Sequence, residues 1–300
     1  MRYRCDYFRV ETNTTILSFL KEACLFFKSD DQVREWMSQE LVLVDEIICT
    51  NPSQSIIAGQ TVTLLTPESF EPKVNKNYSV IFEDEHILII NKPAPLPTHP
   101  SGKFYFNTLS QLLIDNGKLD VNEVHPVYRL DKETSGVIVF AKSRTVASTL
   151  QSKQKNHITN KTYIAITHNT LQPSKGIINK PLQKIDTNER RNVTIISNDG
   201  KPSITEYDVI ESNPQNNYSL IQLILHTGRR HQIRAHLSYC NCPIVGDKTY
   251  EIKEKRPRDI SRQFLHCSSI TLQHPVSKNK QAFKAKLPND MVSFLNRKIR

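Results

Sequence analysis

Glycine is scarce in this sequence, and the motifs that depend on it are missing. Only 8 of the 300 residues are glycine. The chain contains no phosphate-binding P-loop, no G-x-G-x-x-G dinucleotide pattern and no G-x-S-x-G nucleophile turn. Loops that cradle a nucleotide therefore have little material, and we expect no nucleotide cofactor.

Long apolar runs are also absent. No stretch approaches the roughly 18 apolar residues that a membrane helix needs, and residues 1–15 lack the apolar segment of a secretion signal. The six cysteines are spread along the chain, apart from one C-x-C pair at Cys240 and Cys242. Reduced thiols are the better expectation for such a chain. We therefore expect a cytoplasmic protein with no membrane partner, and we expect it to be a monomer.

A zinc-ligand pattern is missing too. His231, His236, Cys240 and Cys242 have the spacing H-x4-H-x3-C-x-C. That spacing matches no familiar set of zinc ligands, and no C-x-x-C pair supports it. We expect no metal site.

Positive charge is what the sequence has in excess, and it is unevenly distributed. The chain carries 40 Lys and Arg against 30 Asp and Glu, a net charge of +10. Residues 1–75 hold 7 basic and 11 acidic residues, whereas the rest of the chain holds 33 and 19. A basic body of this size suggests a polyanionic partner, most often nucleic acid. On charge alone, a merely soluble basic protein is an equally good reading.

The first part of the chain indicates a small domain. Residues 15–28 and 31–40 have apolar side chains at helical spacing, with Asp30 as a candidate cap of the second helix. The stretches LVLVDEII (41–48) and QTVTLL (60–65) are typical of short strands, with a turn at AGQ between them. This pattern predicts two helices followed by a small hairpin.

The rest of the chain is long enough for one larger domain. We expect a small domain over 1–70, a linker over 71–77 and a large domain over 78–300. Strand candidates come in groups with helices between them, which favours an α+β fold with a mixed, largely antiparallel sheet over regular alternation. The expected strands are at 79–93 (two strands around an acidic turn), 136–143, 161–167, 204–210 and 218–226, and the expected helices are at 107–115, 144–155 and 230–239.

Asp131 is the first candidate site residue. It follows Arg129 and precedes Thr-Ser-Gly and the apolar run 137–141. A purely structural role, as a surface ion pair or the cap of a turn, is one interpretation. A carboxylate at the end of a buried strand is also held rigidly and partly desolvated, which can make it reactive. We expect a turn at this point, with Glu133 directed into solvent.

The second candidate is the basic helix RRHQIRAHLSY at 229–239. His231 and Arg234 are three residues apart and share one face. Arg229, Arg230 and His231 lie at the expected helix start, where backbone N–H groups favour a phosphate. The pattern suggests a phosphate clamp with one arginine turned toward an acid. A solvated basic helix is the alternative, and we prefer it for Arg230.

Tyr163 is the third candidate. It opens an expected strand just after Lys161. A tyrosine in this position usually packs within a sheet, but its ring could also serve as a platform for a nucleic-acid base.

Several segments in order resemble the RluA-type RNA pseudouridine synthases. They cover about residues 78–290 and are EDEHILIINKPAPLPTHPSG (83–102), YRLDKETSGVIVFAK (128–142), KTYIAI (161–166), TGRRHQIRAHLSYCNCPIVGDKTY (227–250) and QFLHCSSITLQHPVSKNKQAFKAKLP (263–288). The resemblance implies the pseudouridine synthase fold with a central active-site cleft. It also implies isomerisation of uridine to pseudouridine in rRNA or tRNA, without cofactor, metal or energy source.

The same resemblance assigns roles to the candidates. Asp131 matches the catalytic aspartate, as nucleophile or as base. Tyr163 matches the tyrosine that stacks on the uracil and takes the proton from its carbon 5. Arg234 matches the arginine that pairs with the aspartate. The basic residues expected to contact RNA are Arg129, Arg229, Arg230, His231 and Lys161.

Two features depart from the family pattern. The family usually has histidine directly before the arginine of the aspartate motif, where this chain has Tyr128. The unit at 10–66 resembles the small RNA-binding domain called S-four, yet its net charge is negative and its helices lack a basic run. We expect that fold without expecting RNA contact from it.

Two other functions fit parts of the sequence. A catalytically silent RNA-binding or RNA-folding module could keep the scaffold, although it has no reason to keep Asp131, Tyr163 and Arg234 together. A base-removing N-glycosidase could also use Asp131, but it would need a positioned water and usually a second acid. Glu133 is the nearby candidate for that acid.

Overall fold

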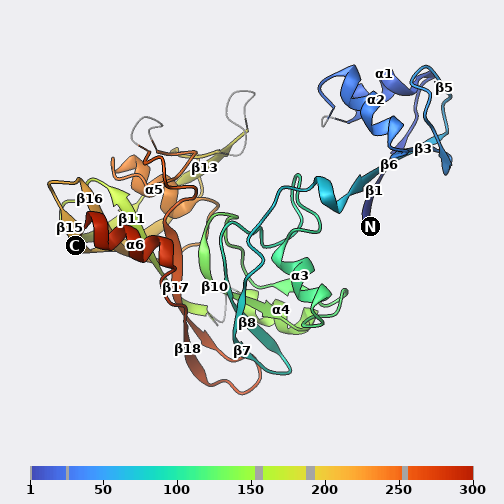
Figure 1. Cartoon of the computed structure of the whole chain (residues 1–300). Coiled ribbons are helices and arrows are strands. Elements are labelled where there is room, and N and C mark those ends of the chain that lie inside the picture. The colour runs from blue at the N-terminus through green and yellow to red at the C-terminus, as the bar shows by residue number, and fades with distance from the viewer. Residues whose placement is uncertain (1, 25–26, 153–157, 187–192, 252–255, 300) are drawn as a thin grey trace. The chain divides into compact units, whose positions relative to one another are not determined.

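The computed structural model describes residues 2–24, 27–152, 158–186, 193–251 and 256–299. The chain divides into two compact units (Figure 1). Unit 1 comprises Met1–Pro72 and Gly102–Phe106, and unit 2 comprises Lys73–Ser101 and Asn107–Arg300. Among the residues described, no helix is both long and apolar enough to cross a membrane.

Unit 1 is built on a four-stranded antiparallel sheet with two helices. The strand order is β1 (Tyr3–Arg9), β6 (Thr61–Pro67), β3 (Val42–Val44) and β4 (Ile47–Ile48). A separate short ladder joins β2 (Thr14–Thr15) to β5 (Ser55–Ile56), and the helical elements are α1 (Ile16–Ala23), α2 (Asp30–Ser38) and the 3₁₀ turn η1 (Glu68–Phe70). Val33, Trp36 and Met37 of α2 are buried. The apolar stripe of that helix therefore contributes to the core of the unit.

The structure corrects three details of the small domain. Both helices are present, although residues 25–26 of the first predicted range lie outside the described residues. The cap of α2 is Ser29, whose hydroxyl accepts from the backbone N–H of Gln32 at 3.4 Å, so Asp30 is the first helical residue. The stretch 41–48 is two strands, because Asp45 and Glu46 adopt positive φ angles of 46° and 69° and reverse the chain. Strand β1 was not predicted.

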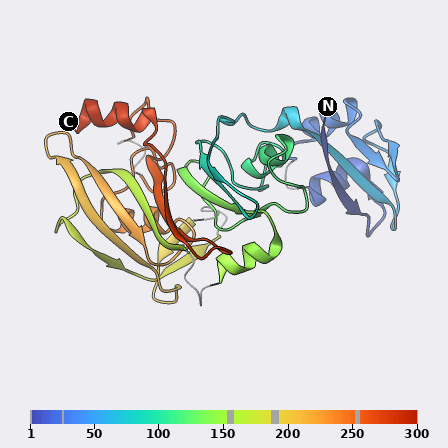
Figure 2. The same cartoon turned by 90° about the horizontal axis from the view of Figure 1, so that it is seen from below.

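Unit 2 contains a sheet of ten described strands (Figures 1 and 2), and the sheet is mixed and largely antiparallel, as the sequence predicted. Along the sheet the order is β12 (Lys175–Asn179), β15 (Ile204–Asn213), β16 (Tyr218–Leu225), β11 (Ile158–His168), β17 (Leu265–Gln273), β10 (Ser135–Ala141), β8 (Ile87–Lys92) and β7 (Ser79–Glu83). Strand β18 (Lys280–Lys284) pairs with β17, and β9 (His125–Pro126) pairs with β10. A separate hairpin joins β13 (Leu182–Ile185) to β14 (Val193–Ile196).

One pair of neighbours in this sheet is parallel, and it is very short. Strands β10 and β17 pair only at Ser135↔His266 and Gly136↔Cys267. Gly136 has φ +113°, and a Cβ there would lie 2.2 Å from the carbonyl oxygen of Cys267. A side chain would therefore collide with the neighbouring backbone, and only glycine permits this approach. The joint connects the part of the sheet around β8 with the part around β11.

Among the described residues, four helices accompany the large sheet: α3 (Leu109–Asp115), α4 (Arg144–Gln151), α5 (Gln232–Tyr239) and α6 (Asn289–Lys298). The first three lie within the predicted ranges, and residues 153–155 of the range predicted for α4 lie outside the described residues. Helix α6 was not predicted. It packs through Phe294, whose ring centroid is 5.0 Å from that of Tyr218 on β16 and 5.3 Å from that of Phe264.

Candidate active site

Asp131 lies in a turn immediately before the most buried strand of the sheet. The backbone N–H of Thr134 donates to the carbonyl oxygen of Asp131 at 3.0 Å, which closes the predicted turn. All seven residues of β10 that follow are buried. The hydroxyl of Thr98 donates to the Leu130 carbonyl at 3.0 Å and accepts from the Leu130 N–H at 3.3 Å. The Asp131 side chain nevertheless remains 34% exposed, so a fixed carboxylate is open to a ligand.

Lys92 supports the same turn from inside the protein. Its side chain is fully buried, and its ammonium donates to the carbonyl oxygens of Leu96 at 2.7 Å, Pro93 at 3.0 Å and Lys132 at 3.3 Å. Burial lowers the pKa of Lys92 to about 7, although the nearby charge of Asp131 acts to raise it. The backbone of Lys132, which follows Asp131, is thus held by the buried ammonium group of Lys92, a donor that water cannot replace.

Arg234 is the direct partner of Asp131. It projects from α5, its side chain is 8% exposed, and its Nη1 donates to Asp131 Oδ2 at 2.9 Å. Its Nε and Nη2 donate to the two carboxylate oxygens of the fully buried Asp247, each at 2.7 Å. The fork of one guanidinium therefore spans two acids, a geometry that lysine could not reproduce.

The segment after Gly246 forms the floor on which Arg234 rests. Asp247 Oδ1 also accepts from the backbone N–H groups of Thr249 at 3.0 Å and Tyr250 at 3.3 Å. The guanidinium of Arg234 lies 5.1 Å from the centroid of the Tyr250 ring. Gly246 has φ +80°, and a Cβ there would lie 2.1 Å from a backbone oxygen, so this tight path needs glycine.

These contacts determine the charge state of Asp131. Burial acts to raise its pKa, but the neighbouring His231 and Arg234 and the hydrogen bond from Arg234 lower it more, so the pKa lies below its usual range. Arg234 is cationic at every relevant pH. We conclude that Asp131 is ionised near neutral pH, which suits a nucleophile or a base.

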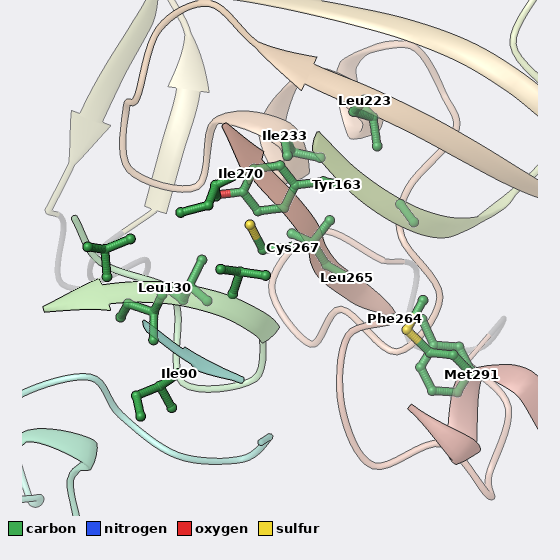
Figure 3. Close-up of a cluster of buried hydrophobic side chains, with 14 of the residues drawn as sticks. Ile90, Leu130, Tyr163, Leu223, Ile233, Phe264, Leu265, Cys267, Ile270 and Met291 are labelled. Atoms are coloured by element: carbon green, nitrogen blue, oxygen red, sulfur yellow. The ribbon is translucent and has the colours of Figure 1, made fainter. Parts of the chain in front are cut away.

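Tyr163 lies on β11 within the hydrophobic core, near enough to Asp131 for the charge of the carboxylate to act on its phenol. Its register partner on β17 is Cys267, and Figure 3 shows the sulfur of Cys267 directed toward the Tyr163 ring, with Ile233 and Ile270 nearby. Burial, followed by the effects of Cys267 and of Asp131, raises the pKa of Tyr163 well above its ordinary value. The phenol is therefore neutral and rigidly packed.

His231 lies closer to the carboxylate than the phosphate-clamp hypothesis assumed. It precedes α5 with a left-handed backbone, φ 52°, and its Nε2 is 3.8 Å from Asp131 Oδ2. Burial, its largest perturbation, lowers the pKa of His231 to about 4. His231 is accordingly a neutral side chain of the site at physiological pH.

The other predicted basic residues lie in different settings. Arg129 and Arg230 are exposed, and Arg129 Nη1 is 3.4 Å from His99 Nε2. Arg229 is partly buried and donates from Nε to the Pro202 carbonyl at 3.3 Å. Lys161 is partly buried, and burial lowers its pKa. The exposed arginines therefore suit an RNA backbone better than Lys161 does.

Tyr128, the departure from the family pattern, has a structural contact. Its hydroxyl donates to the Val137 carbonyl on β10 at 2.8 Å. The Nζ of Lys161 lies 4.5 Å from the centroid of its ring. Tyr128 thereby links the strand that follows Asp131 with the strand that carries Tyr163.

The expectation that Glu133 points into solvent is wrong. Its side chain is 17% exposed and accepts from Lys248 Nζ at 3.3 Å. This contact involves Glu133 in an ion pair with the segment after Gly246. The second acid that an N-glycosidase would need is thus already engaged.

Sequence reasoning missed Lys92, Thr98 and Asp247. Lys92 is the last residue of β8, Thr98 lies in the loop that follows it, and Asp247 lies in the stretch VGDKTY, for which the sequence suggested no role. A lysine at the end of the apolar run ILIINK was the available signal, because an unpaired lysine is rarely fully buried. Nothing local indicated that Asp247 holds Arg234, since the two residues meet only when the loop between them closes.

Known proteins that resemble this chain agree with the geometry of the site. The family model of RNA pseudouridylate synthase matches residues 86–239, a range that contains Asp131, Tyr163 and Arg234. The chain belongs to this family, and it is an isomerase that acts on RNA.

Particular relatives agree with this assignment. The RNA pseudouridine synthase YhcT of Bacillus subtilis (strain 168) is 33% identical over 264 residues, covering 86% of this chain and 85% of the relative. Ribosomal large subunit pseudouridine synthase D of Escherichia coli (strain K12) is 31% identical over 286 residues, covering 89% and 85%. Among solved structures, human RNA pseudouridylate synthase domain containing 4 aligns with a TM-score of 0.57 and 26% identity, covering 73% of this chain and 92% of that one.

Proposed function

We propose that this protein isomerises uridines of large-subunit ribosomal RNA, with Asp131 as the catalytic carboxylate. The observation that carries the proposal is the contact of 2.9 Å between Asp131 and Arg234, which keeps a partly open carboxylate ionised. Ribosomal RNA is favoured over tRNA because several relatives at 30–31% identity are named ribosomal large subunit pseudouridine synthases. The proposed activity on ribosomal RNA and the free cysteines are in keeping with a cytoplasmic location.

The reaction conserves every atom of the nucleotide. Asp131 either attacks C1′ of the ribose or removes a proton from C2′, and in both cases the bond between N1 and C1′ breaks. The detached uracil turns, and a bond forms between C5 and C1′ while the bond from Asp131 to C1′ breaks or, by the second route, while Asp131 returns the proton to C2′. The proton on C5 then leaves, and N1 gains a proton. A carboxylate that is ionised beforehand and held within a covered site serves either first step.

Arg234 and Tyr163 have different tasks in this proposal. Arg234 holds Asp131 ionised and oriented. Tyr163 contacts the uracil, which must leave its stack to reach the carboxylate. Because burial keeps the phenol of Tyr163 protonated, it can take the C5 proton only if its own proton passes to a neighbouring group. N1 of the turned uracil, which gains a proton as C5 loses one, is the acceptor that we assign, so that the phenol ends as it began.

Attraction to RNA comes from the basic large domain. Residues 76–300 carry 33 Lys and Arg against 19 Asp and Glu. Arg129 and Arg230 are exposed near the site, and we assign them, with Arg229, to the phosphates. We assign unit 1 an S-four-like fold whose acidic surface does not contribute to this attraction.

Mapping pseudouridines in all cellular RNA tests the proposal. RNA from cells with the gene, without it, and without it but expressing the Asp131→Ala variant would be compared at single-nucleotide resolution. We expect at least one site in large-subunit ribosomal RNA that disappears without the gene and does not return with the variant. A site confined to tRNA would redirect the proposal to tRNA, and an unchanged map would refute it.

A further inference from the structure

The hydrogen bonds of Tyr250 fix which nitrogen of His231 carries a proton. The hydroxyl of Tyr250 donates to the Thr194 carbonyl at 2.9 Å and accepts from the Thr194 backbone N–H at 2.9 Å. Its single proton is therefore used. His231 Nδ1 is 3.2 Å from the same oxygen, so Nδ1 must carry a hydrogen and donate it. In the neutral ring, Nε2 is then left with a lone pair.

That lone pair lies beside the reactive carboxylate. Nε2 of His231 is 3.8 Å from Asp131 Oδ2, which is too far for a direct hydrogen bond. Both atoms are acceptors, so neither satisfies the other. Asp131 Oδ2 already accepts from Arg234, so a hydroxyl group placed beside the carboxylate can donate its single proton to Nε2.

The backbone holds His231 in this position. The residue adopts φ 52° and ψ 20° just before α5, and its carbonyl accepts from the N–H of Ala235 at 2.9 Å. Its ring meets the Tyr250 ring edge to face, with centroids 5.9 Å apart. A left-handed conformation is unfavourable for most side chains and marks a position set by its surroundings.

We propose that His231 accepts a hydrogen bond from the ribose 2′-hydroxyl of the target uridine. This inference rests on the proposed function, which places Asp131 at C1′ or C2′. The 2′-hydroxyl is bonded to C2′ and lies one bond further from C1′, so it is the uridine donor that must come close to Asp131 under either mechanism. His231 thereby lets the site distinguish a ribose from a deoxyribose.

This role differs from a contact with phosphate. A phosphate would need a donor at Nε2, whereas the Tyr250 contact leaves an acceptor there. The exposed Arg230 beside it offers the positive charge that a phosphate needs. The two neighbours thus have separable tasks, and Arg230 provides the matched control for His231.

The test compares two RNA oligonucleotides that carry the mapped uridine, one with ribose and one with 2′-deoxyribose at that nucleotide. For each protein the ratio of their kcat/KM values is measured, and a deoxy oligonucleotide that is not converted is measured by its inhibition constant against the ribose form. We expect the wild type to favour ribose, with about three- to tenfold of that preference due to one neutral hydrogen bond. His231→Gly, which suits the positive φ, should lose that part of the ratio.

Two further variants separate this role from others. Tyr250→Phe removes the acceptor of the Nδ1 proton, so it should lower the ribose preference while leaving His231 in place. Arg230→Ala should weaken both oligonucleotides equally and leave the ratio unchanged. A ratio in His231→Gly within twofold of the wild-type ratio would overturn the inference while the proposed function stood. A wild type that converts no uridine would refute the function, and the inference with it.

Discussion

Asp247 accepts two hydrogen bonds from Arg234 and thereby leaves the third donor group of Arg234 to face Asp131. The two bonds to Asp247 are 2.7 Å long, and the bond to Asp131 is 2.9 Å long. Asp247 is fully buried, whereas Asp131 is partly exposed. The buried Asp247 therefore anchors Arg234, and the more exposed Asp131 accepts a hydrogen bond from the arginine held in this way.

Asp247→Asn tests this order. The amide can accept at only one atom, so Arg234 loses part of its anchor while Asp131 keeps its own partner. Breaking a buried ion pair costs about 3–5 kcal/mol, and we expect unfolding to become easier by about that amount. We also expect kcat/KM to fall about 10- to 100-fold. Thr249→Val, which removes only the 3.2 Å bond from Arg234, is the milder control. Unchanged kinetics in a destabilised Asp247→Asn protein would show that Asp247 serves stability alone.

Asp131→Asn should abolish catalysis and spare binding. The amide keeps the size of the side chain but is neither a nucleophile nor a base, so we expect pseudouridine formation to fall at least about a thousandfold. The affinity for the mapped RNA, measured by filter binding, should change by less than about threefold. If the variant rescued a growth defect of cells without the gene as well as the wild type did, the essential task would be RNA binding.

Tyr163→Phe separates the ring from its hydroxyl. The ring remains packed against Cys267 and Ile233, so we expect nearly unchanged stability and RNA affinity. Pseudouridine formation should fall about a hundredfold, because the group that moves the C5 proton is gone. Tyr163→Leu is the comparison, and it should also lose stability, by about 2–4 kcal/mol. Full activity in Tyr163→Phe would remove the hydroxyl from the mechanism.

Lys92 makes stability depend on pH in a defined direction. Its pKa is about 7 in the folded protein and about 10.4 in an unfolded chain. Between these values the unfolded chain binds more protons, so stability rises with pH by up to about 1.4 kcal/mol per pH unit. The contribution is lowest below pH 7, where Lys92 is charged in both states. Lys92→Met has no such group, so its deficit relative to the wild type should grow from pH 7 to pH 10 in denaturant titrations. Parallel curves for the two proteins would contradict the assignment.

Gly136→Ala should prevent folding of the large domain. The added Cβ would meet the Cys267 carbonyl at 2.2 Å in a backbone with φ +113°. Gly228→Ala is the matched control, because its Cβ would find only Lys161 Nζ, at 3.9 Å. Circular dichroism and thermal melting should show a folded Gly228→Ala protein and an unfolded Gly136→Ala protein. A normal melting curve for Gly136→Ala would show that the joint between β10 and β17 can relax.

Local patterns predicted the parts of the fold whose cause is local. The turn at Asp131 was predicted because Thr-Ser-Gly follows it, and α5 was predicted from its buried Ile233 and Leu237. Strand order was beyond such patterns, since β10 and β17 are separated by more than 120 residues of chain. Helix α6 was missed although Met291, Phe294 and Leu295 have helical spacing.

The residues of the site were predictable where single segments carry a motif, and not where residues of different segments meet. Motifs within single segments drew attention to Asp131, Tyr163 and Arg234. The supporting residues came from other segments, and their types were ambiguous: Lys92 reads as a strand end and Asp247 as a loop acid. The protonation of His231 could not be predicted from its own segment, because it depends on Tyr250, 19 residues later, and on Thr194 before it.

The narrow joint in the large sheet has a consequence for the geometry of catalysis. Cys267 has Gly136 as its register partner on one side and Tyr163 on the other. Asp131 lies just before β10, which carries Gly136, whereas Tyr163 lies on β11. The distance between Asp131 and the phenol of Tyr163 therefore depends on the width of one strand, β17. A small change in twist there would alter the separation of Asp131 and Tyr163, without any change in the reacting groups themselves.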